Sequence, residues 1–291
     1  MEYLVKLEAP VLGFSVQVRD MRNSKWEDHI DCLCGKKLQK VGKESGKLIF
    51  EREIFEKEGL ARILCADNDQ IFISDFCTLY AFRQDDYELL GKWQLGEDLS
   101  SDICGMTVDG DTVYCSIRNG KLVTVNRTSF QHREYVVSDS SMWNMKVYGR
   151  YLLCGSVDGQ LLMLDKEMMT VQKRLCLGKQ NIRSLFIDNQ TLYAASQDKK
   201  LYKISLPDLE VMDMKRNVHK KMFNCAGLCG DMIVTVSFPC SEIALWNKDT
   251  LEKTGQISVP LKLSGCTYID GNRLYISSRN IDGIISQMLC I

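Results

Sequence analysis

Eight residues of this chain have side chains that could bind a ligand or a partner, and they recur at equivalent places in a repeated pattern. Arginine forks suit carboxylate or phosphate groups, and tryptophan with phenylalanine suits a planar or apolar group or a partner's side chain. These residue types and their spacing therefore predict a surface that binds a ligand or a partner. The predicted binding residues are Arg62, Asp102, Arg118, Trp143, Asn144, Arg183, Phe223 and Asn224.

A simpler interpretation of the same residues is structural. Residues at the start of a strand are often polar when they face a water-filled channel in the protein. A single tryptophan at such a position often packs over the channel opening and has only a structural role. Both interpretations of each residue stay open at the level of sequence.

Signs of catalysis and of metal binding are weak. The chain has no Gly-Lys-Ser/Thr phosphate loop, no Gly-x-Ser-x-Gly elbow and no His-Glu-x-x-His motif. His29, Cys32 and Cys34 lie close together, but in a strand the two cysteines point to one face and the histidine to the other. We expect no catalytic residue, no metal and no cofactor, and we interpret the basic run 219–221 as a solvated loop.

Charge and cysteine content limit the partners and the compartment. The 37 basic and 38 acidic residues leave a net charge of −1, so neither nucleic acid nor an anionic membrane is favoured as a partner. The first ten residues lack the features of a signal peptide. Thirteen cysteines in such a chain indicate reduced thiols, and Cys115 and Cys154 are expected to act as small core residues. The prediction is a soluble, cytoplasmic monomer.

A repeat of about 41 residues organises the chain. Each unit has an apolar run that ends in a serine, and a turn of Gly, Asn or Asp precedes that run. A third run starting with Leu or Ile follows, and then a short polar hairpin and a fourth run. The serines that mark the repeat are Ser74, Ser116, Ser156, Ser196, Ser237 and Ser277, which are 40 to 42 residues apart.

Four short antiparallel strands in about 41 residues are typical of a propeller blade. We predict an all-β, seven-bladed β-propeller that forms a single domain over residues 1–291. The last unit stops after three strands, so we expect the N-terminal strand at 2–9 to complete it. The predicted blades are 10–56, 57–97, 98–138, 139–178, 179–218, 219–260, and 261–291 together with 1–9.

Two stretches carry a family resemblance. GSVDGQLLMLDKEMMTVQKRLCLG at 155–178 and ASQDKKLYKISLPDLEVMDM at 195–214 resemble the repeats of WD40-like and quinoprotein-like seven-bladed propellers. The Gly-His and Trp-Asp pairs of strict WD40 repeats are absent, and Leu245-Trp246-Asn247 is the nearest approach. Because the chain has no vicinal cysteines, the resemblance does not extend to quinone binding.

Two functions remain as alternatives. The first is a non-catalytic platform that binds a protein or peptide partner through the loops at one mouth of the channel, because propellers bind through these loops. The second is a small-molecule-binding protein or a propeller enzyme of the lyase or hydrolase type, with a polar site at the same mouth.

Overall fold

The computed structural model describes residues 18–23, 28–43, 45, 47–56, 61–67, 69–221, 223–237, 242–258, 262–271 and 273–279. These residues form 26 strands and one short 3-10 helix, η1 (Leu99–Ser101). The chain is therefore all-β in its described part, as predicted. With only three residues in η1, none of these segments forms a helix that is long and apolar enough to cross a membrane.

Six of the sheets have four antiparallel strands each, in chain order. The first sheet contains β1 (Val18–Asn23), β2 (His29–Cys34), β3 (Lys37–Gly42) and β4 (Leu48–Glu53). The second contains β5 (Ala61–Ala66), β6 (Gln70–Asp75), β7 (Thr78–Arg83) and β8 (Leu89–Gln94). The third contains β9 (Ile103–Asp109), β10 (Thr112–Ile117), β11 (Lys121–Asn126) and β12 (His132–Val136).

The next three sheets repeat the same order. The fourth contains β13 (Met142–Tyr148), β14 (Tyr151–Ser156), β15 (Gln160–Asp165) and β16 (Thr170–Cys176). The fifth contains β17 (Ile182–Asp188), β18 (Thr191–Ser196), β19 (Lys200–Ser205) and β20 (Val211–Lys215). The sixth contains β21 (Phe223–Cys229), β22 (Met232–Ser237), β23 (Glu242–Asn247) and β24 (Lys253–Ser258).

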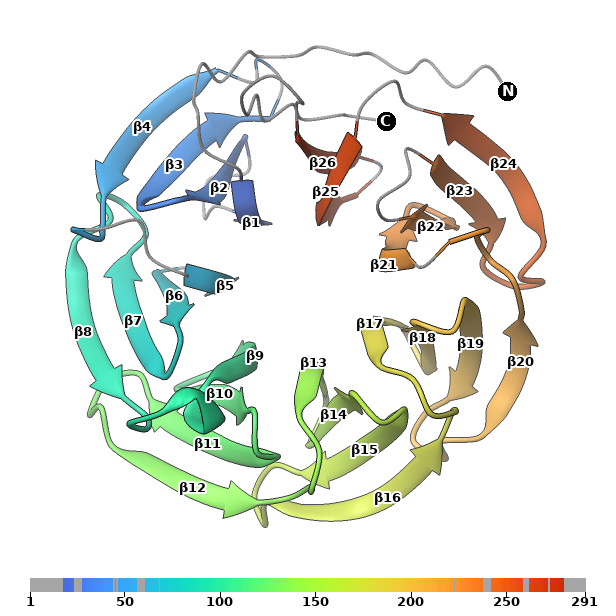
Figure 1. Ribbon diagram of the computed structural model, residues 1–291, viewed down its shortest axis with the longest axis horizontal. Coiled ribbons are helices and arrows are strands. Elements are labelled where there is room, and N and C mark those ends of the chain that lie inside the picture. The colour runs from blue at the N-terminus through green and yellow to red at the C-terminus, as the bar shows by residue number, and fades with distance from the viewer. Residues whose placement is uncertain are drawn as a thin grey trace.

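The predicted count of seven four-stranded blades was wrong. The described residues form six such blades, and only two strands, β25 (Lys262–Asp270) and β26 (Arg273–Arg279), make up the sheet between the sixth blade and the first (Figure 1). The count differs because the third strand expected in the last unit and the closing strand expected at 2–9 both lie outside the described residues. The sheets stand around a central axis, with β1, β5, β9, β13, β17, β21 and β25 innermost (Figure 1).

Burial follows the position of a strand within its blade. The second strand β14 is buried along nearly its whole length, whereas the outermost strand β16 is mostly exposed. A second strand has a neighbouring blade on each face, which explains why its sequence is a continuous apolar run. The predicted turns between first and second strands are confirmed at Gly110 and Asn189, whose φ angles are 53° and 52°.

The hydrophobic core is divided among the junctions between neighbouring sheets. One cluster joins Leu153 and Leu161 of the fourth blade to Leu192 and Ile204 of the fifth. Another joins Ile30, Cys32 and Val41 of the first blade to Tyr275 of the two-stranded sheet, so apolar packing extends across the place where the ring closes. The remaining clusters occupy the other junctions of the described chain. Each blade therefore depends on both of its neighbours for a core.

Candidate functional site

The innermost strand of every four-stranded blade has a one-residue bulge at its second position. In β13, for example, Met142 pairs with Ser156 and Asn144 pairs with Gly155, which leaves Trp143 without an opposite residue in the ladder. A bulge of this kind redirects a side chain, and bulges are common at the rims of barrels and beside active sites. We call the six bulged residues the bulge ring: Arg19, Arg62, Cys104, Trp143, Arg183 and Asn224.

The bulge separates a core position from an accessible one. The residue before the bulge is buried in each blade where its side chain is described: Ile103, Met142, Ile182 and Phe223 are at most 1% exposed. In contrast, Trp143 is 40% exposed, and Cys104 and Arg183 are half-buried. A fully buried side chain cannot reach a partner, so the place of Phe223 in the predicted binding face is corrected. It is a core residue of the fifth and sixth blades.

Trp143, Asn144 and Arg183 come together across the junction of the fourth and fifth blades. The Arg183 guanidinium carbon lies 4.9 Å from the centre of the Trp143 ring, which is a cation–π arrangement. The Asn144 side chain donates from Nδ2 to the Arg183 carbonyl oxygen at 2.8 Å and accepts at Oδ1 from the Leu185 amide at 3.4 Å. The amide side chain thus ties β13 to β17 and sets the tryptophan beside the arginine.

Asp102 and Arg118 form a second pair at the same end of the third blade. The Arg118 Nη2 atom lies 2.5 Å from Asp102 Oδ2, and the Arg118 amide donates to the Asp102 carbonyl oxygen at 2.8 Å. Asp102 is almost fully buried, while 47% of the Arg118 side chain is exposed. This hydrogen bond raises the pKa of the Arg118 guanidinium. Asp102 therefore holds Arg118 in place, and Arg118 is the exposed residue of the pair.

The remaining two predicted residues occupy matching backbone positions. Arg62 is the bulged residue of β5 and Asn224 that of β21. The eight predicted residues therefore do not form one continuous cluster. Four of them belong to the bulge ring, Asn144 follows it in β13, Asp102 and Arg118 flank strands of the third blade, and Phe223 is core. The recurrence of small register shifts could not be read from the sequence, because it depends on strand pairing.

The opposite face of the ring carries ion pairs between neighbouring blades. In each pair an aspartate at or just after the end of a first strand meets a basic residue that follows the third strand of the next blade. Lys248 Nζ lies 3.0 Å from Asp188 Oδ2, and Lys43 Nζ lies 2.5 Å from Asp270 Oδ2. The four pairs are Asp67–Arg127, Asp109–Lys166, Asp188–Lys248 and Asp270–Lys43. From the sequence alone these aspartates are interpreted only as turn residues, although they recur in the repeat.

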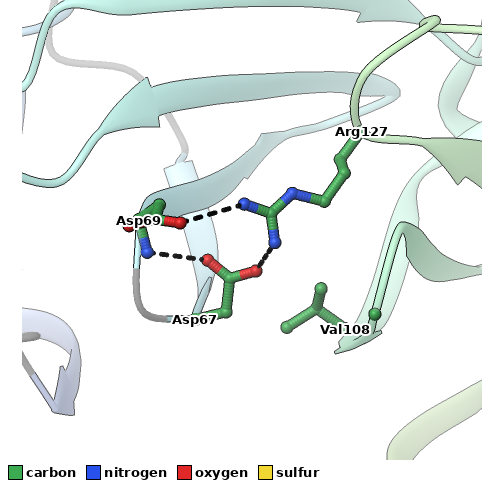
Figure 2. Close-up of a pocket in the computed structure, with 5 residues that line it drawn as sticks. Asp67, Asp69, Val108 and Arg127 are labelled. Carbon is green, nitrogen blue, oxygen red and sulfur yellow. Dashed lines mark hydrogen bonds and ion pairs between the residues drawn. The ribbon is translucent and has the colours of Figure 1, made fainter.

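An open hollow of about 270 Å³ also lies on this opposite face. It is lined by Asp67, Asp69, Val108, Gly110 and Arg127. Figure 2 shows the Arg127 guanidinium directed at both aspartates, with Asp69 donating from its amide to Asp67 at 3.1 Å. The arginine is thus engaged by carboxylates of this chain, and the hollow is separate from the predicted channel-mouth face.

A buried hydrogen-bond network in the sixth blade corrects one prediction. The run 219–221 was interpreted as solvated, and Lys220 and Lys221 are exposed, but the His219 side chain is fully buried. Its Nε2 lies 2.8 Å from the Thr235 hydroxyl oxygen, which also accepts from Trp246 Nε1 at 2.8 Å. Its Nδ1 lies 3.2 Å from Glu242 Oε1. A neutral imidazole that donates to Glu242 and accepts from Thr235 satisfies this geometry.

Burial lowers the pKa of His219 because the charged form loses its hydration, and the nearby Glu242 carboxylate opposes this effect. The network links His219 to Trp246 through Thr235, and these two residues stand in Val218-His219 and Trp246-Asn247, which resemble the Gly-His and Trp-Asp pairs only in His and Trp. The signal available in the sequence was Trp246, which shares the Thr235 hydroxyl with His219.

The cysteines considered for metal binding or reactivity lie in the core. Cys32 and Cys34 belong to the cluster at the junction of the first blade and the two-stranded sheet, and burial raises the pKa of Cys34 to about 12. A metal ligand must be a thiolate, which this burial disfavours. Cys115 and Cys154 are fully buried, which confirms their predicted packing role. Within the described ranges no three His, Cys, Asp or Glu residues are grouped so that they could hold a metal ion.

Comparison with solved structures identifies the architecture. The β-propeller domain of Cps50 (Swd1) from Myceliophteria thermophila superposes with a TM-score of 0.80 at 11% identity, covering 94% of this chain and 96% of that one. The fold is a β-propeller. The WD40 β-propeller domain of Doa1 superposes with a TM-score of 0.79 at 13% identity, covering 99% and 97% of the two chains. No protein-family model and no curated protein matches the sequence of this propeller.

Proposed function

We propose that this propeller is a non-catalytic platform that binds a peptide or an extended segment of a protein at the channel mouth bearing the bulge ring. The observation that carries the proposal is the Trp143–Arg183 pair, in which a 40% exposed indole lies 4.9 Å from a guanidinium. Tryptophan and arginine are the residue types most enriched among those that dominate binding energy in interfaces. Rigid aromatic groups also lose little conformational entropy on binding.

The surroundings of this pair support a preformed contact site. The Asn144 side chain donates a hydrogen bond to the backbone carbonyl oxygen of Arg183, and Met142, next to Trp143, is completely buried. The tryptophan therefore projects from an anchored strand, and a partner would not have to order it. We further propose that the protein acts as a cytoplasmic monomer, because a chain with thirteen cysteines and no features of a signal peptide is expected to keep reduced thiols.

A peptide-display selection against the immobilised protein tests the proposal. Peptides enriched on the wild type are expected to bind the Trp143→Ala variant at least about tenfold more weakly, the loss typical of a central contact residue. The matched control is Trp93→Ala, because Trp93 packs on Phe130 at 4.7 Å near the outer edge of the ring. Equal binding to wild type and Trp143→Ala would overturn the proposal, as would enrichment only of peptides that depend on Trp93.

A further inference from the structure

The mouth end of the fifth blade concentrates positive charge. Three segments meet there: residues 177–181 lead into β17, residues 197–200 run from β18 into β19, and residues 215–221 lead from the end of β20 toward β21. The acidic residue of these segments is Asp198. We call their basic residues the basic patch: Lys179, Lys199, Lys200, Lys215, Arg216, Lys220 and Lys221. Because the whole chain has a net charge of −1, this sector differs sharply from the rest of the molecule.

Hydrogen bonds hold the three segments side by side. The Lys199 ammonium donates to the Lys220 carbonyl oxygen at 2.7 Å, and the Val218 amide donates to the Lys199 carbonyl oxygen at 3.1 Å. The Gln197 amide donates to the Asn181 carbonyl oxygen at 2.8 Å, which ties in the segment that leads into β17. Charges that are separated in the sequence therefore lie on one continuous surface.

The chain's own acids neutralise little of this charge. Asp198 Oδ2 lies 2.5 Å from Lys200 Nζ and so offsets the charge of that lysine. Five residues of the patch are exposed and take part in no ion pair within the described chain: Lys179, Lys215, Arg216, Lys220 and Lys221. Like charges placed together on a surface repel one another, so an acidic group supplied by a partner would relieve that repulsion.

The basic patch occupies one sector of the mouth. The matching loops of the third and fourth blades instead carry exposed acids, which are Glu97, Asp98, Asp139 and Asp158. The basic residue of those loops, Arg118, is paired with Asp102. A nucleic acid or an anionic membrane that covered the whole mouth would meet these acids and be repelled. A short acidic segment of a protein can lie on the fifth blade alone.

The patch adjoins the contact site proposed above. The segment that carries Lys179 leads into β17, whose Arg183 lies against Trp143 of the neighbouring fourth blade (Figure 1). A peptide that places an apolar side chain on Trp143 can therefore extend an acidic part over the fifth blade. The exposed charges of the patch are mostly flexible lysines, so they should act through long-range attraction, which raises the association rate and depends on salt.

We propose that the basic patch docks an acidic segment of a protein partner, rich in aspartate or glutamate, and that this attraction speeds binding at the channel mouth. The inference rests on the proposed platform function. It adds the charge of the partner and the place on the fifth blade where that charge binds.

Fluorescence polarisation with two labelled peptides tests the inference. One peptide alternates Glu and Gly and carries a single Leu, and the other is identical except that Gln replaces every Glu. The wild type is expected to bind the Glu peptide about tenfold more tightly at low salt, and added salt should reduce the difference. A variant with both Lys220→Gln and Lys221→Gln should bind the Glu peptide about fivefold more weakly. Stopped-flow mixing should assign most of that loss to slower association.

Matched variants separate the patch from net charge. Lys47→Gln with Arg133→Gln removes the same charge from exposed residues of the β3–β4 turn and of β12, and it should leave binding unchanged. Lys220→Arg with Lys221→Arg keeps the charge and should bind like the wild type. Thermal melts verify that each variant is folded. Equal affinity for the two peptides, equal losses in the two Gln variants, or a loss confined to faster dissociation would overturn the inference.

Two other polyanions complete the experiment. A single-stranded oligonucleotide and vesicles that contain phosphatidylserine are expected to bind more weakly than the Glu peptide, because both would also meet the acids of the third and fourth blades. Tighter binding of either one, lost in the Lys220→Gln and Lys221→Gln variant, would assign the patch to that partner and overturn the inference.

The two proposals fail in different ways. If selected peptides require Trp143 but the Glu and Gln peptides bind alike, the platform function stands and the acidic specificity is wrong. If the Glu peptide binds through Lys220 and Lys221 but no selected peptide depends on Trp143, the basic patch stands as a docking surface and the proposed contact at Trp143 is wrong.

Discussion

Lys43 and Asp270 form an ion pair that joins the first blade to the two-stranded sheet, with 2.5 Å between Nζ and Oδ2, although the two residues are 227 positions apart in sequence. Only 7% of the lysine side chain is exposed, compared with 35% of the aspartate. Apolar contacts between Tyr275 and the Ile30 and Val41 region lie at the same junction. Closure of the ring among the described residues therefore combines a charge pair with a hydrophobic cluster.

The contribution of this pair can be measured by a double-mutant cycle. Lys43→Met, Asp270→Asn and the double variant should give a coupling free energy of about 1–2 kcal/mol in urea unfolding, because the lysine is largely shielded from water. The comparison pair is Arg83–Glu88, whose side chains are 45% and 51% exposed, and about 0.5 kcal/mol is expected there. Similar coupling at the two sites would contradict the role assigned to Lys43 and Asp270.

The His219 network predicts a dependence of stability on pH. Burial holds the pKa of His219 below its ordinary value of 6.5, so as pH falls below that value the unfolded chain takes up a proton before the folded protein does. The free energy of unfolding should therefore decrease as pH is lowered from about 7.5 to about 5.5. Urea unfolding across this range measures the effect.

Two variants separate His219 from other titrating groups. Glu242→Gln removes a carboxylate that favours the protonated ring and should lower the pKa of His219 further, which NMR of the imidazole would detect. Lys253, which also acts on the ring, opposes protonation and is unchanged in this variant. His132→Gln alters an exposed residue of β12 and should not change the slope of stability with pH. A His219 ring that titrates at its ordinary value would refute the prediction.

Deletion of residues 1–9 tests the prediction that the N-terminal strand completes the last blade and closes the ring. We propose that this segment adds a strand to the last sheet, so its loss should lower Tm by about 5 °C or more through lost pairing and packing. Val5→Pro should act in the same direction because proline cannot donate to a strand ladder, whereas Val5→Thr keeps a β-branched side chain and serves as the control. An unchanged melting temperature after deletion would exclude this role.

The propeller architecture was predictable because its evidence is local and repeated. The serines from Ser74 to Ser277 mark the ends of second strands, and the Gly, Asn and Asp turns mark their beginnings. Each unit must bury both faces of its apolar strands, which requires neighbours on either side and so a ring. The number of complete blades was less accessible, since it depends on how the two ends of the chain pair.

The sequence by itself determined the repeat and the all-β class, and it predicts a set of polar and aromatic residues near one mouth of the channel. Tertiary structure decided which of these are accessible: one bulge in β21 separates buried Phe223 from the bulged position of Asn224. It also brought Trp143 to Arg183 and Lys43 to Asp270 across blade junctions. The physical reason is that a register shift moves a side chain out of the ladder of paired strands. Such shifts, and the distances between residues of neighbouring blades, are set only when the strands pair.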